Sequence, residues 1–383
     1  MEYEGPRAAR ADELGDVLKL VNLVFRTSRG LPPTMGEEFP LLFNEENAEN
    51  LRIIKRGEEV VSHVGIFECE ALIYGCRLKV GMIGSVCTHP EHRRRGLATA
   101  LLRDAFEKMR RDGVDIVMIS GIRGLYDRAG CAIAGAGYDL ELTRESLEAL
   151  SAEGVEAVEG GGAPEYATIY QRECVRYMRP LRHLEKLFES RAWYVERPTR
   201  RIRVLVLEAG EPVGYLIVHV PDGGAVGRVV EYAGCREAVV RGLKAVAESQ
   251  GLEALRLKVP AWDVGMISAL RRHGLKLPHY TTPLADTVRL LNVEDAFERL
   301  QPYFRERTDE EVSVSVEDDV YRVAVGHYEI TLRGPKELAW LVFGVPERVP
   351  EPFRRFMAGV PKAPEAFRSV FPIPLVPYGL YYT

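Results

Sequence analysis

The chain of 383 residues is long enough for two to three domains, because a globular domain averages about 150 residues. Hydrophobic residues make up 46% and charged residues 28%, which excludes a mainly disordered chain. The net charge of −5 argues against a dedicated nucleic-acid-binding protein, since such proteins usually carry a basic excess.

The six cysteines form no Cys-x-x-Cys pair and stand at no zinc-site spacing from a histidine, so we expect free thiols and no metal. The first residues contain no apolar segment of a signal peptide, and no apolar run approaches the roughly 18 residues of a spanning helix. We therefore expect a soluble, cytoplasmic protein with neither a membrane nor a nucleic acid as partner.

The first 150 residues alternate between helix and strand patterns. Apolar side chains recur at helical spacing over 12–25, and segments 51–54 and 60–70 have the composition of a strand hairpin. The segments that follow predict a strand, an amphipathic helix that ends at a glycine, and a buried strand. These segments are 77–88, 98–111 and 114–120. The alternation predicts an α/β domain over residues 1–150.

A segment rich in glycine over 151–164 marks a boundary, and the order of elements then recurs. The second copy has a hairpin over 204–220, a helix over 237–249, a strand over 252–259 and a short helix over 266–273. This repetition predicts an internal duplication, with the second unit over residues 151–288. Two unrelated α/β domains are the alternative.

The pattern changes again after about residue 290. Apolar residues alternate with polar ones over 312–316, 321–325 and 330–332, which predicts an antiparallel meander. Segments 336–343 and 352–357 resemble short helices. The last residues, 371–383, are apolar and rich in proline, so we expect an extended tail that is docked on the protein. We assign this third domain to residues 289–383.

The strongest chemical signal is the turn Arg93-Arg94-Arg95-Gly96-Leu97-Ala98, between a predicted strand and a predicted helix. Gly96 and the small Ala98 allow a tight turn with free backbone N–H groups at the helix start, where the helix dipole favours a pyrophosphate. The bare pattern also suits a basic turn that only caps a helix. The strand before it and the helix and strand after it favour the phosphate interpretation.

This turn resembles that of the GNAT superfamily of N-acetyltransferases, in which Arg/Gln-x-x-Gly-x-Gly/Ala holds the pyrophosphate of acetyl-CoA. The resemblance implies acetyl-CoA as cosubstrate, lying where the strands at 77–88 and 114–120 separate. The implied binding residues are Ser85, Val86, Cys87, Arg93, Arg94, Arg95, Gly96, Leu97, Ala98, Gly121 and Ile122. The second unit has Gly234-Cys235-Arg236-Glu237 at the corresponding place and lacks the turn, so we expect it to bind no cofactor.

The three-part layout, together with the segment 125–130, is similar to that of the Eis-type (enhanced intracellular survival) acetyltransferases. This resemblance implies an α/β (α+β) protein with tandem GNAT folds, the second degenerate, and a sterol-carrier-protein-like α/β domain at the end. It also implies a hexamer.

Acetyl transfer to an amine requires a base for the amine and an acid for the departing thiolate. The family resemblance implies Tyr126 as the acid and the terminal carboxylate, here that of Thr383, as the base. Taken alone, a tyrosine in a short amphipathic helix is more often a packing residue. Glu37, Glu38 and His63 remain alternative bases, and the terminal carboxylate could instead bind a cationic substrate.

We therefore expect an acetyl-CoA-dependent N-acetyltransferase that acts on a primary amine by direct attack in a ternary complex. The resemblance implies a cationic acceptor, such as an aminoglycoside-like compound, a polyamine or a lysine. An acyl-enzyme on Cys87 is disfavoured because the sequence places no base beside it. The alternative is an acyl-CoA-sensing or lipid-binding protein, for which a deep apolar cavity in the third domain would speak.

Overall fold

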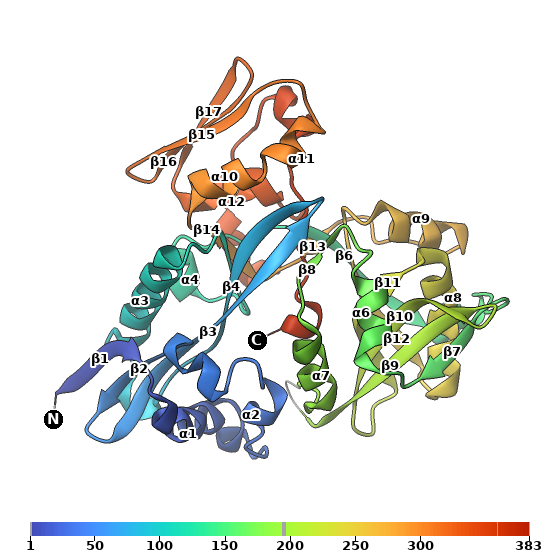
Figure 1. Ribbon diagram of the computed structural model, residues 1–383, viewed down its shortest axis with the longest axis horizontal. Helices are drawn as coiled ribbons and strands as arrows, with labels where there is room; N and C mark the ends of the chain where they lie inside the picture. Colours follow the sequence, from blue (N-terminus) through green and yellow to red (C-terminus); the bar gives the residue numbers. More distant parts are fainter. Residues whose placement is uncertain (1, 194–196, 358, 383) are drawn as a thin grey trace.

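The computed structural model describes residues 2–193, 197–357 and 359–382, which form two seven-stranded sheets and one three-stranded sheet (Figure 1). The two large sheets lie beside each other, and the small sheet stands above the first of them in this view. The mixed α/β architecture agrees with the fold class expected from the sequence.

The first sheet has the order β1-β2-β3-β4-β5-β14, and β8 pairs with β3. Its strands are β1 (Tyr3–Ala8), β2 (Leu51–Arg56), β3 (Glu59–Ile73), β4 (Cys76–Thr88), β5 (Ile116–Ile119), β8 (Val175–Tyr177) and β14 (Thr287–Leu290). Helices α1 (Leu14–Phe25) and α3 (Leu97–Arg111) contribute to different core clusters and cover opposite faces of this sheet. The remaining elements of this part are α2 (Met35–Glu38), α4 (Gly124–Arg128), η1 (Ala11–Glu13), η2 (Thr27–Arg29), η3 (Glu45–Asn50) and η4 (Pro90–His92).

The second sheet has the order β13-β6-β12-β11-β10-β9-β7. Its strands are β6 (Ala136–Thr143), β7 (Glu156–Glu159), β9 (Thr199–Glu208), β10 (Glu211–Pro221), β11 (Val226–Gly234), β12 (Ala254–Pro260) and β13 (Thr282–Pro283). Helices α8 (Arg236–Ser249) and α9 (Val264–Arg272) pack into a core on one face. The other helices are α5 (Arg144–Glu148), α6 (Ala163–Tyr170) and α7 (Leu181–Glu189).

The predicted duplication is visible in the order of elements in the two large sheets. Each has an antiparallel hairpin, then a strand, a helix and a further strand that pairs in parallel with the one before it; the parallel pairs are β4–β5 and β11–β12. The order and spacing of apolar segments were therefore sufficient to predict this repeat.

The two large sheets exchange their last strands, which the sequence analysis did not predict. Strand β6 pairs with β12, and β14, which follows the second unit in the chain, pairs with β5. The expected boundary at residue 150 therefore needs correction, because β6 and α5 precede it in the sequence but belong to the second sheet. Each sheet is completed by a strand from the other part of the chain.

The third part contains the predicted meander. Its strands are β15 (Val312–Glu317), β16 (Val320–Val325) and β17 (Tyr328–Arg333), with Val314, Val323 and Ile330 abreast. Three helices accompany them, α10 (Val293–Arg299), α11 (Gln301–Arg305) and α12 (Pro335–Phe343). The segment expected as a helix over 352–357 lies in a 3-10 helix, η5 (Glu351–Met357), and η6 (Glu365–Ser369) follows it.

The tail beyond residue 371 is docked, as the sequence predicted. Ile373 donates its backbone N–H to the carbonyl of Val342 at 2.7 Å, and Leu375, Leu380 and Tyr381 are buried. A short turn, η7 (Gly379–Tyr381), lies between the first sheet and α7 (Figure 1). The tail therefore runs from the third part of the molecule to the space between the two large sheets. Thr383, the expected base, lies outside the described residues.

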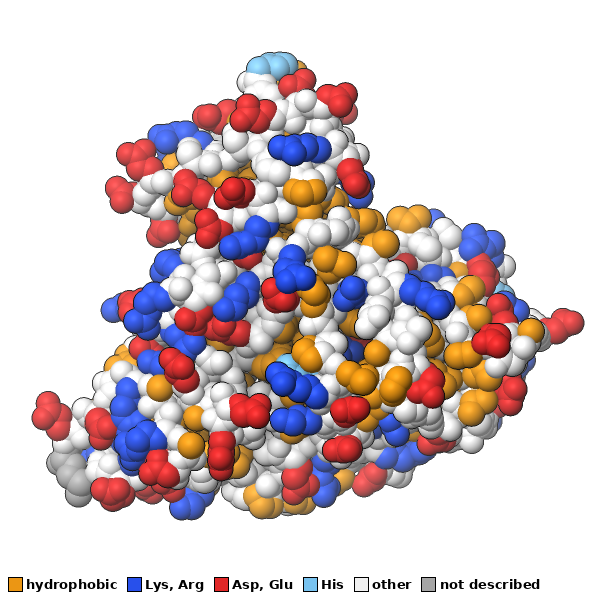
Figure 2. Space-filling model, in the orientation of Figure 1, with side chains coloured by type: hydrophobic (Ala, Val, Ile, Leu, Met, Phe, Trp, Pro, Cys, Tyr) orange, Lys and Arg blue, Asp and Glu red, His pale blue; other side chains and the backbone are white. Residues whose placement is uncertain are grey.

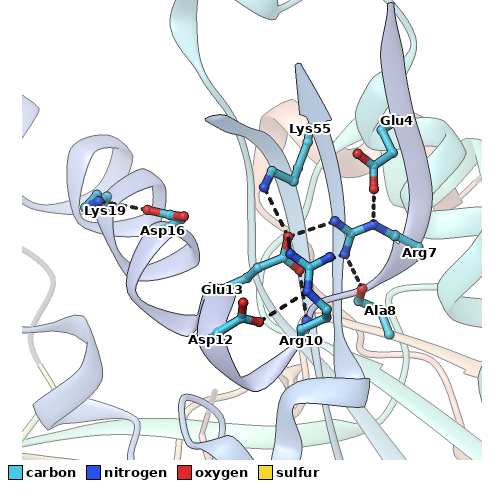
Figure 3. A network of polar contacts seen from close by, with 9 residues as sticks. All are labelled: Glu4, Arg7, Ala8, Arg10, Asp12, Glu13, Asp16, Lys19 and Lys55. Atoms are coloured by element: carbon cyan, nitrogen blue, oxygen red, sulfur yellow. Dashed lines mark hydrogen bonds and ion pairs between the residues drawn. The ribbon is translucent and has the colours of Figure 1, made fainter. Parts of the chain in front are cut away.

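The edge of the first sheet is fixed by a buried carboxylate. Glu13 accepts hydrogen bonds from Arg7 at 2.7 and 2.8 Å, from Lys55 at 3.1 Å and from the backbone N–H of Arg10 at 2.9 Å (Figure 3). The hydrogen bond from Arg7 is the main reason that the pKa of Glu13 lies well below its usual value. This network ties β1, η1 and β2 together.

The face of the molecule drawn in Figure 2 has no broad region of one charge. On the face in Figure 2, acidic and basic side chains are interspersed over all three parts of the molecule. Within residues 2–193, 197–357 and 359–382, no helix is long and apolar enough to cross a membrane.

Candidate functional site

The phosphate turn has the geometry that its sequence predicts. Gly96 caps α3 with a φ of 78°, a left-handed conformation that favours glycine, and a side chain there would meet no atom within 4 Å. The first helical hydrogen bond is donated by Ala100 to Gly96 at 3.0 Å. The N–H groups of Leu97, Ala98 and Thr99 therefore have no acceptor within the helix and can bind an anion.

A cavity of about 530 Å³ opens over this turn. It is lined by Val24, Val86, Cys87, Thr88, His92, Arg93, Arg94, Gly96, Leu97, Ala98, Thr99, Arg123, Leu125 and Arg128. Seven of the eleven predicted cofactor residues are in this set. The cavity combines free N–H groups with several arginines, which suits the phosphates of a nucleotide-containing ligand.

Four predicted cofactor residues do not line the cavity. Arg95 instead donates to the Tyr3 hydroxyl at 3.0 Å and to the carbonyl of Glu91 at 3.3 Å. The other three, Ser85, Gly121 and Ile122, are on β4 or directly after β5. Their spacing in the sequence did not show which of them would face the cavity.

Strands β4 and β5 part where the reacting end of a cosubstrate would lie. Their pairing ends at Ile83, whose carbonyl accepts from Ser120 at 3.3 Å. Ser85 then takes a positive φ of 54°, which turns β4 away from the ladder. Arg123 donates to the carbonyl of Val86 at 3.3 Å across this gap. The separation leaves backbone groups of β4 available to a ligand.

Tyr126 lies beside this gap. It belongs to α4, is 1% exposed, and its ring is 3.8 Å from the position that a side chain on Gly121 would take. Burial raises the pKa of Tyr126, and the positive charge of Arg123 opposes the rise. The phenol therefore carries its proton at neutral pH and can donate it.

Cys87 faces the cavity but is unsuited to nucleophilic attack. Its side chain is buried, and this burial raises the pKa of the thiol to about 12 despite Arg123 and Arg93 nearby. A thiol in this state is almost fully protonated at neutral pH, whereas the thiolate is the nucleophile. The environment of Cys87 supports direct transfer without an acyl-enzyme.

The tail brings its last described residue to the same gap. The hydroxyl of Tyr382 is hydrogen-bonded to the side chain of Ser120, directly after β5, and its ring stacks on Trp193 at 4.5 Å. Two residues earlier, Leu380 donates its N–H to the carboxylate of Glu231 at 3.0 Å. A buried Arg179 pairs with that carboxylate at 2.8 Å. The tail is thereby held at a fixed depth.

Asp286 is a candidate functional residue that the sequence analysis missed. It lies between β13 and β14, and its Oδ2 accepts the N–H of Gly121 at 2.6 Å. Burial raises the pKa of Asp286. Asp286 also lines a cavity of about 680 Å³, together with Tyr378 and Tyr382 of the tail. A lone aspartate in a loop carries no sequence signal; only the exchanged strand β14 brings it here.

The alternative bases are engaged elsewhere. Glu38 is buried against Arg26, to which it is bonded at 2.9 Å, and Glu37 pairs with Arg191 at 2.9 Å on the surface. His63 is fully buried, and this burial lowers its pKa to about 3. A base must exchange protons with the acceptor, and none of the three lines either of the two large cavities.

Comparison with known proteins agrees with this geometry. Residues 6–134 match the family model described as an acetyltransferase (GNAT) domain. The matched segment contains α1 to α4 and the whole phosphate turn, and the match supports an enzyme of the acyltransferase class. The expectation of an enzyme is thus confirmed.

Solved structures resemble the chain over its full length. A GCN5-related N-acetyltransferase from Anabaena variabilis is 17% identical, with 98% of both chains covered and a TM-score of 0.65. One from Kribbella flavida is 18% identical, covering 100% of this chain and 98% of the other, with a TM-score of 0.63. Eis1 from Mycobacterium abscessus is 16% identical, with 99% of both chains covered and a TM-score of 0.63. Among curated proteins no sequence match was found. At these identities the likeness concerns the fold.

The second unit differs from the GNAT domain at the start of its equivalent helix, α8. Gly234 is enclosed, since a side chain there would meet the carbonyl of Val213 at 2.2 Å. The carboxylate of Glu173 accepts the Gly234 N–H at 2.7 Å and pairs with Arg236 at 2.7 Å. A carboxylate of the protein itself thus lies before α8, where the first unit has the open turn before α3. The expectation that this unit binds no cofactor remains a prediction, with this physical reason.

Proposed function

We propose that the protein is an acetyl-CoA-dependent N-acetyltransferase that transfers acetyl to a primary amine in a ternary complex. The observation that carries this proposal is the place of Tyr126. This buried, protonated phenol lies where β4 and β5 part, next to the cavity over the phosphate turn. The turn that can bind phosphates, the gap that can take a thioester and the proton donor Tyr126 thus follow one another in space.

Acetyl-CoA would supply an acetyl thioester, and the residues of this chain would hold and protonate it. The amides at the start of α3, with Arg93 and Arg94, would bind the phosphates. The part of β4 after Ser85 would align the pantetheine arm with its backbone. As the bond from the acetyl carbon to sulfur breaks, Tyr126 would give its hydroxyl proton to the sulfur, so that CoA leaves as the thiol, a better leaving group than the thiolate.

Two groups are suited to remove the proton of the amine. The family resemblance favours the terminal carboxylate of Thr383, and the position of Tyr382 at Ser120 supports a tail that ends in the site. Asp286 is the second candidate, because its half-buried carboxylate is close enough to Tyr126 to contribute to the raised pKa of that phenol. A base whose pKa is raised toward neutral pH is a better proton acceptor than an ordinary carboxylate.

We propose further that the chain is of the Eis type, with a cationic amine as acceptor, such as an aminoglycoside-like compound, a polyamine or a lysine. The structural likeness to Eis1 over the full length supports this assignment. A hexameric assembly, a cytoplasmic location and a sterol-carrier-like third domain belong to the same proposal.

A lipid-binding function is the weaker alternative. The cavity found among the described residues of the third part has about 160 Å³ and is lined by apolar residues such as Trp340 and Phe371. Sites for small molecules usually have 300 Å³ or more. The cavity is therefore small for a sterol, and the phosphate turn with Tyr126 beside it favours catalysis.

The proposal is tested by release of the CoA thiol from acetyl-CoA with a panel of aminoglycosides, polyamines and lysine peptides. The same panel is applied to a chain extended by a few residues beyond Thr383. Release that requires an amine supports the transferase, and its loss on extension supports the terminal carboxylate as base. Tight acetyl-CoA binding without release for any amine would contradict the transferase. Release that is unaffected by extension would assign the role of the base to Asp286 instead.

A further inference from the structure

Four basic side chains stand abreast on one face of the second sheet. The strand register places Arg201 opposite His219, His219 opposite Arg228, and Arg228 opposite Arg256. Directly opposite residues in a sheet point to the same side. This basic row crosses β9, β10, β11 and β12, and Glu141 on β6 ends it.

The members of the basic row differ in how their charge is compensated. Arg256 pairs with Glu141 at 2.9 Å. Arg201 donates to the carbonyls of Leu187 and Ser190 at the end of α7, where the helix dipole favours a cation. Arg228 is exposed and has no ion-pair partner among the described residues. It is thus the one uncompensated cation in this row.

Two N–H groups in or beside this row have no hydrogen-bond acceptor among the described residues. Arg201 donates Nε–H to Nε2 of His219 at 3.2 Å, so the proton of the neutral imidazole is on Nδ1. Neither this Nδ1 nor the indole Nε1 of Trp193 has a partner among the described residues, and both atoms are buried. The two rings are 5.1 Å apart. A buried donor without an acceptor is costly, so such a pair points to a ligand.

The cavity of about 680 Å³ connects these groups with the proposed acceptor site. Arg228, Trp193, Tyr382 and Asp286 all line it. The other basic side chains of the lining are paired with carboxylates: Arg236 with Glu173, Arg256 with Glu141, and Lys258 with Asp139. The cavity therefore presents the half-buried carboxylate of Asp286 beside the proposed acetyl site and the unpaired guanidinium of Arg228 elsewhere on its wall.

Asp286 and Arg228 line the same cavity as Tyr382, and both charges act on its hydroxyl. Burial is the main reason that the pKa of Tyr382 is raised; Asp286 adds to the rise, and Arg228 opposes it. Both charges thus act at short range on a residue that is bonded to Ser120 at the acetyl site. One small molecule with an amine and an anionic group could meet both.

We propose that the acceptor is an amino acid or short peptide, whose carboxylate binds Arg228 with Trp193 while its amine meets Asp286. This inference rests on the proposed transferase function and narrows its substrate class. A carboxylate can accept hydrogen bonds from both Arg228 and Trp193, neither of which can accept one. Charge-assisted hydrogen bonds from a guanidinium are among the stronger polar contacts. A simple polyamine would leave these donors unpartnered.

The test uses pairs of acceptors that differ only in the carboxylate: lysine against cadaverine, and ornithine against putrescine. We expect the amino acid of each pair to have the lower KM with the unchanged protein. Arg228→Gln should raise the KM for lysine about tenfold to a hundredfold, as for the loss of one charged hydrogen bond. The KM for cadaverine should not rise. Trp193→Phe should have a smaller effect in the same direction.

Arg200→Gln is the matched control, because Arg200 is an exposed arginine on β9 of the same sheet that is bonded to Gln250 and does not line the cavity. Equal KM values for the two acceptors of each pair would overturn the inference, as would an equal rise of both KM values in Arg228→Gln. Neither result would contradict the transferase function. A preference for 3-aminopropylphosphonate over every amino acid would overturn the carboxylate assignment. Calorimetric binding of lysine in the presence of CoA tests the inference without turnover, and no difference between the protein and Arg228→Gln would overturn it.

Discussion

The backbone N–H of Gly121 donates to Oδ2 of Asp286 at 2.6 Å, and this bond joins residues 165 positions apart in the chain. It forms because β14 pairs with β5, so the loop before β14 reaches the end of β5. Strand exchange between the two units therefore supplies the first unit with a half-buried carboxylate near Tyr126. The duplication contributes directly to the candidate site.

Replacement of Asp286 tests this contribution. Asp286→Asn keeps an oxygen that can accept the Gly121 N–H but removes the charge that would attract an ammonium group. We expect the KM for amine acceptors to rise about tenfold or more, with the KM for acetyl-CoA unchanged. Asp139→Asn is the control, because Asp139 is exposed in the same cavity lining and already pairs with Lys258. Equal effects of the two substitutions would contradict a specific role of Asp286.

Replacement of Tyr126 tests the assignment of the acid. Tyr126→Phe keeps the buried ring and removes only the hydroxyl proton. We expect kcat to fall about a hundredfold or more, since a positioned acid contributes roughly that factor, while the affinity for acetyl-CoA stays the same. Steady-state kinetics and calorimetry measure the two quantities. A kcat within a factor of two of the unchanged protein would show that Tyr126 only packs.

Alanine substitutions at two glycines on opposite ends of α3 distinguish an effect on stability from an effect on acetyl-CoA binding. Gly96 and Gly113 have φ values of 78° and 75°, and a side chain at either would meet no atom within 4 Å. An alanine at each should therefore cost a similar 1–2 kcal/mol of stability. Only Gly96 lines the cavity over the turn, so Gly96→Ala alone adds a methyl group at this cavity and should weaken acetyl-CoA binding, by about tenfold. Titration calorimetry and thermal unfolding of both variants check this; equal affinities would refute the turn as the phosphate site.

The sequence predicted those features that depend on local patterns. The turn at Gly96, the hairpins, the repeated order of elements and the apolar tail follow from residue types and periodicity within short segments. The sequence did not predict the exchange of β6 and β14, because pairing across more than a hundred residues leaves no local pattern. Asp286 and Glu231 act through partners that only this pairing and the docked tail bring near, so neither could be recognised in advance.

The buried carboxylate of Glu13 predicts a specific acid sensitivity. Because the pKa of Glu13 is lower in the folded protein than its ordinary value of 4.5, the unfolded chain takes up this proton first as the pH falls. The stabilisation is complete above pH 4.5 and is lost progressively below it. Glu13→Gln should cost about 3 kcal/mol at pH 7 and flatten the loss of stability in acid.

Glu4→Gln provides the comparison for Glu13, since Glu4 also pairs with Arg7 but is exposed. It should change the free energy of unfolding by less than about 1 kcal/mol at any pH. Urea unfolding of the unchanged protein, Glu13→Gln and Glu4→Gln between pH 7 and pH 3 gives the free energy of unfolding of each as a function of pH. An acid limb in Glu13→Gln as steep as in the unchanged protein would show that other carboxyl groups determine the acid sensitivity.

The central claim is direct transfer of acetyl to an amine while both substrates are bound. Initial rates of CoA release, with acetyl-CoA and an accepted amine varied together, test it most directly. Direct transfer predicts that CoA release requires the amine. It also predicts that double-reciprocal plots of rate against substrate concentration intersect, as for a ternary complex. Parallel lines would reveal a covalent acetyl-enzyme, and CoA release independent of every amine tested would contradict the transferase itself.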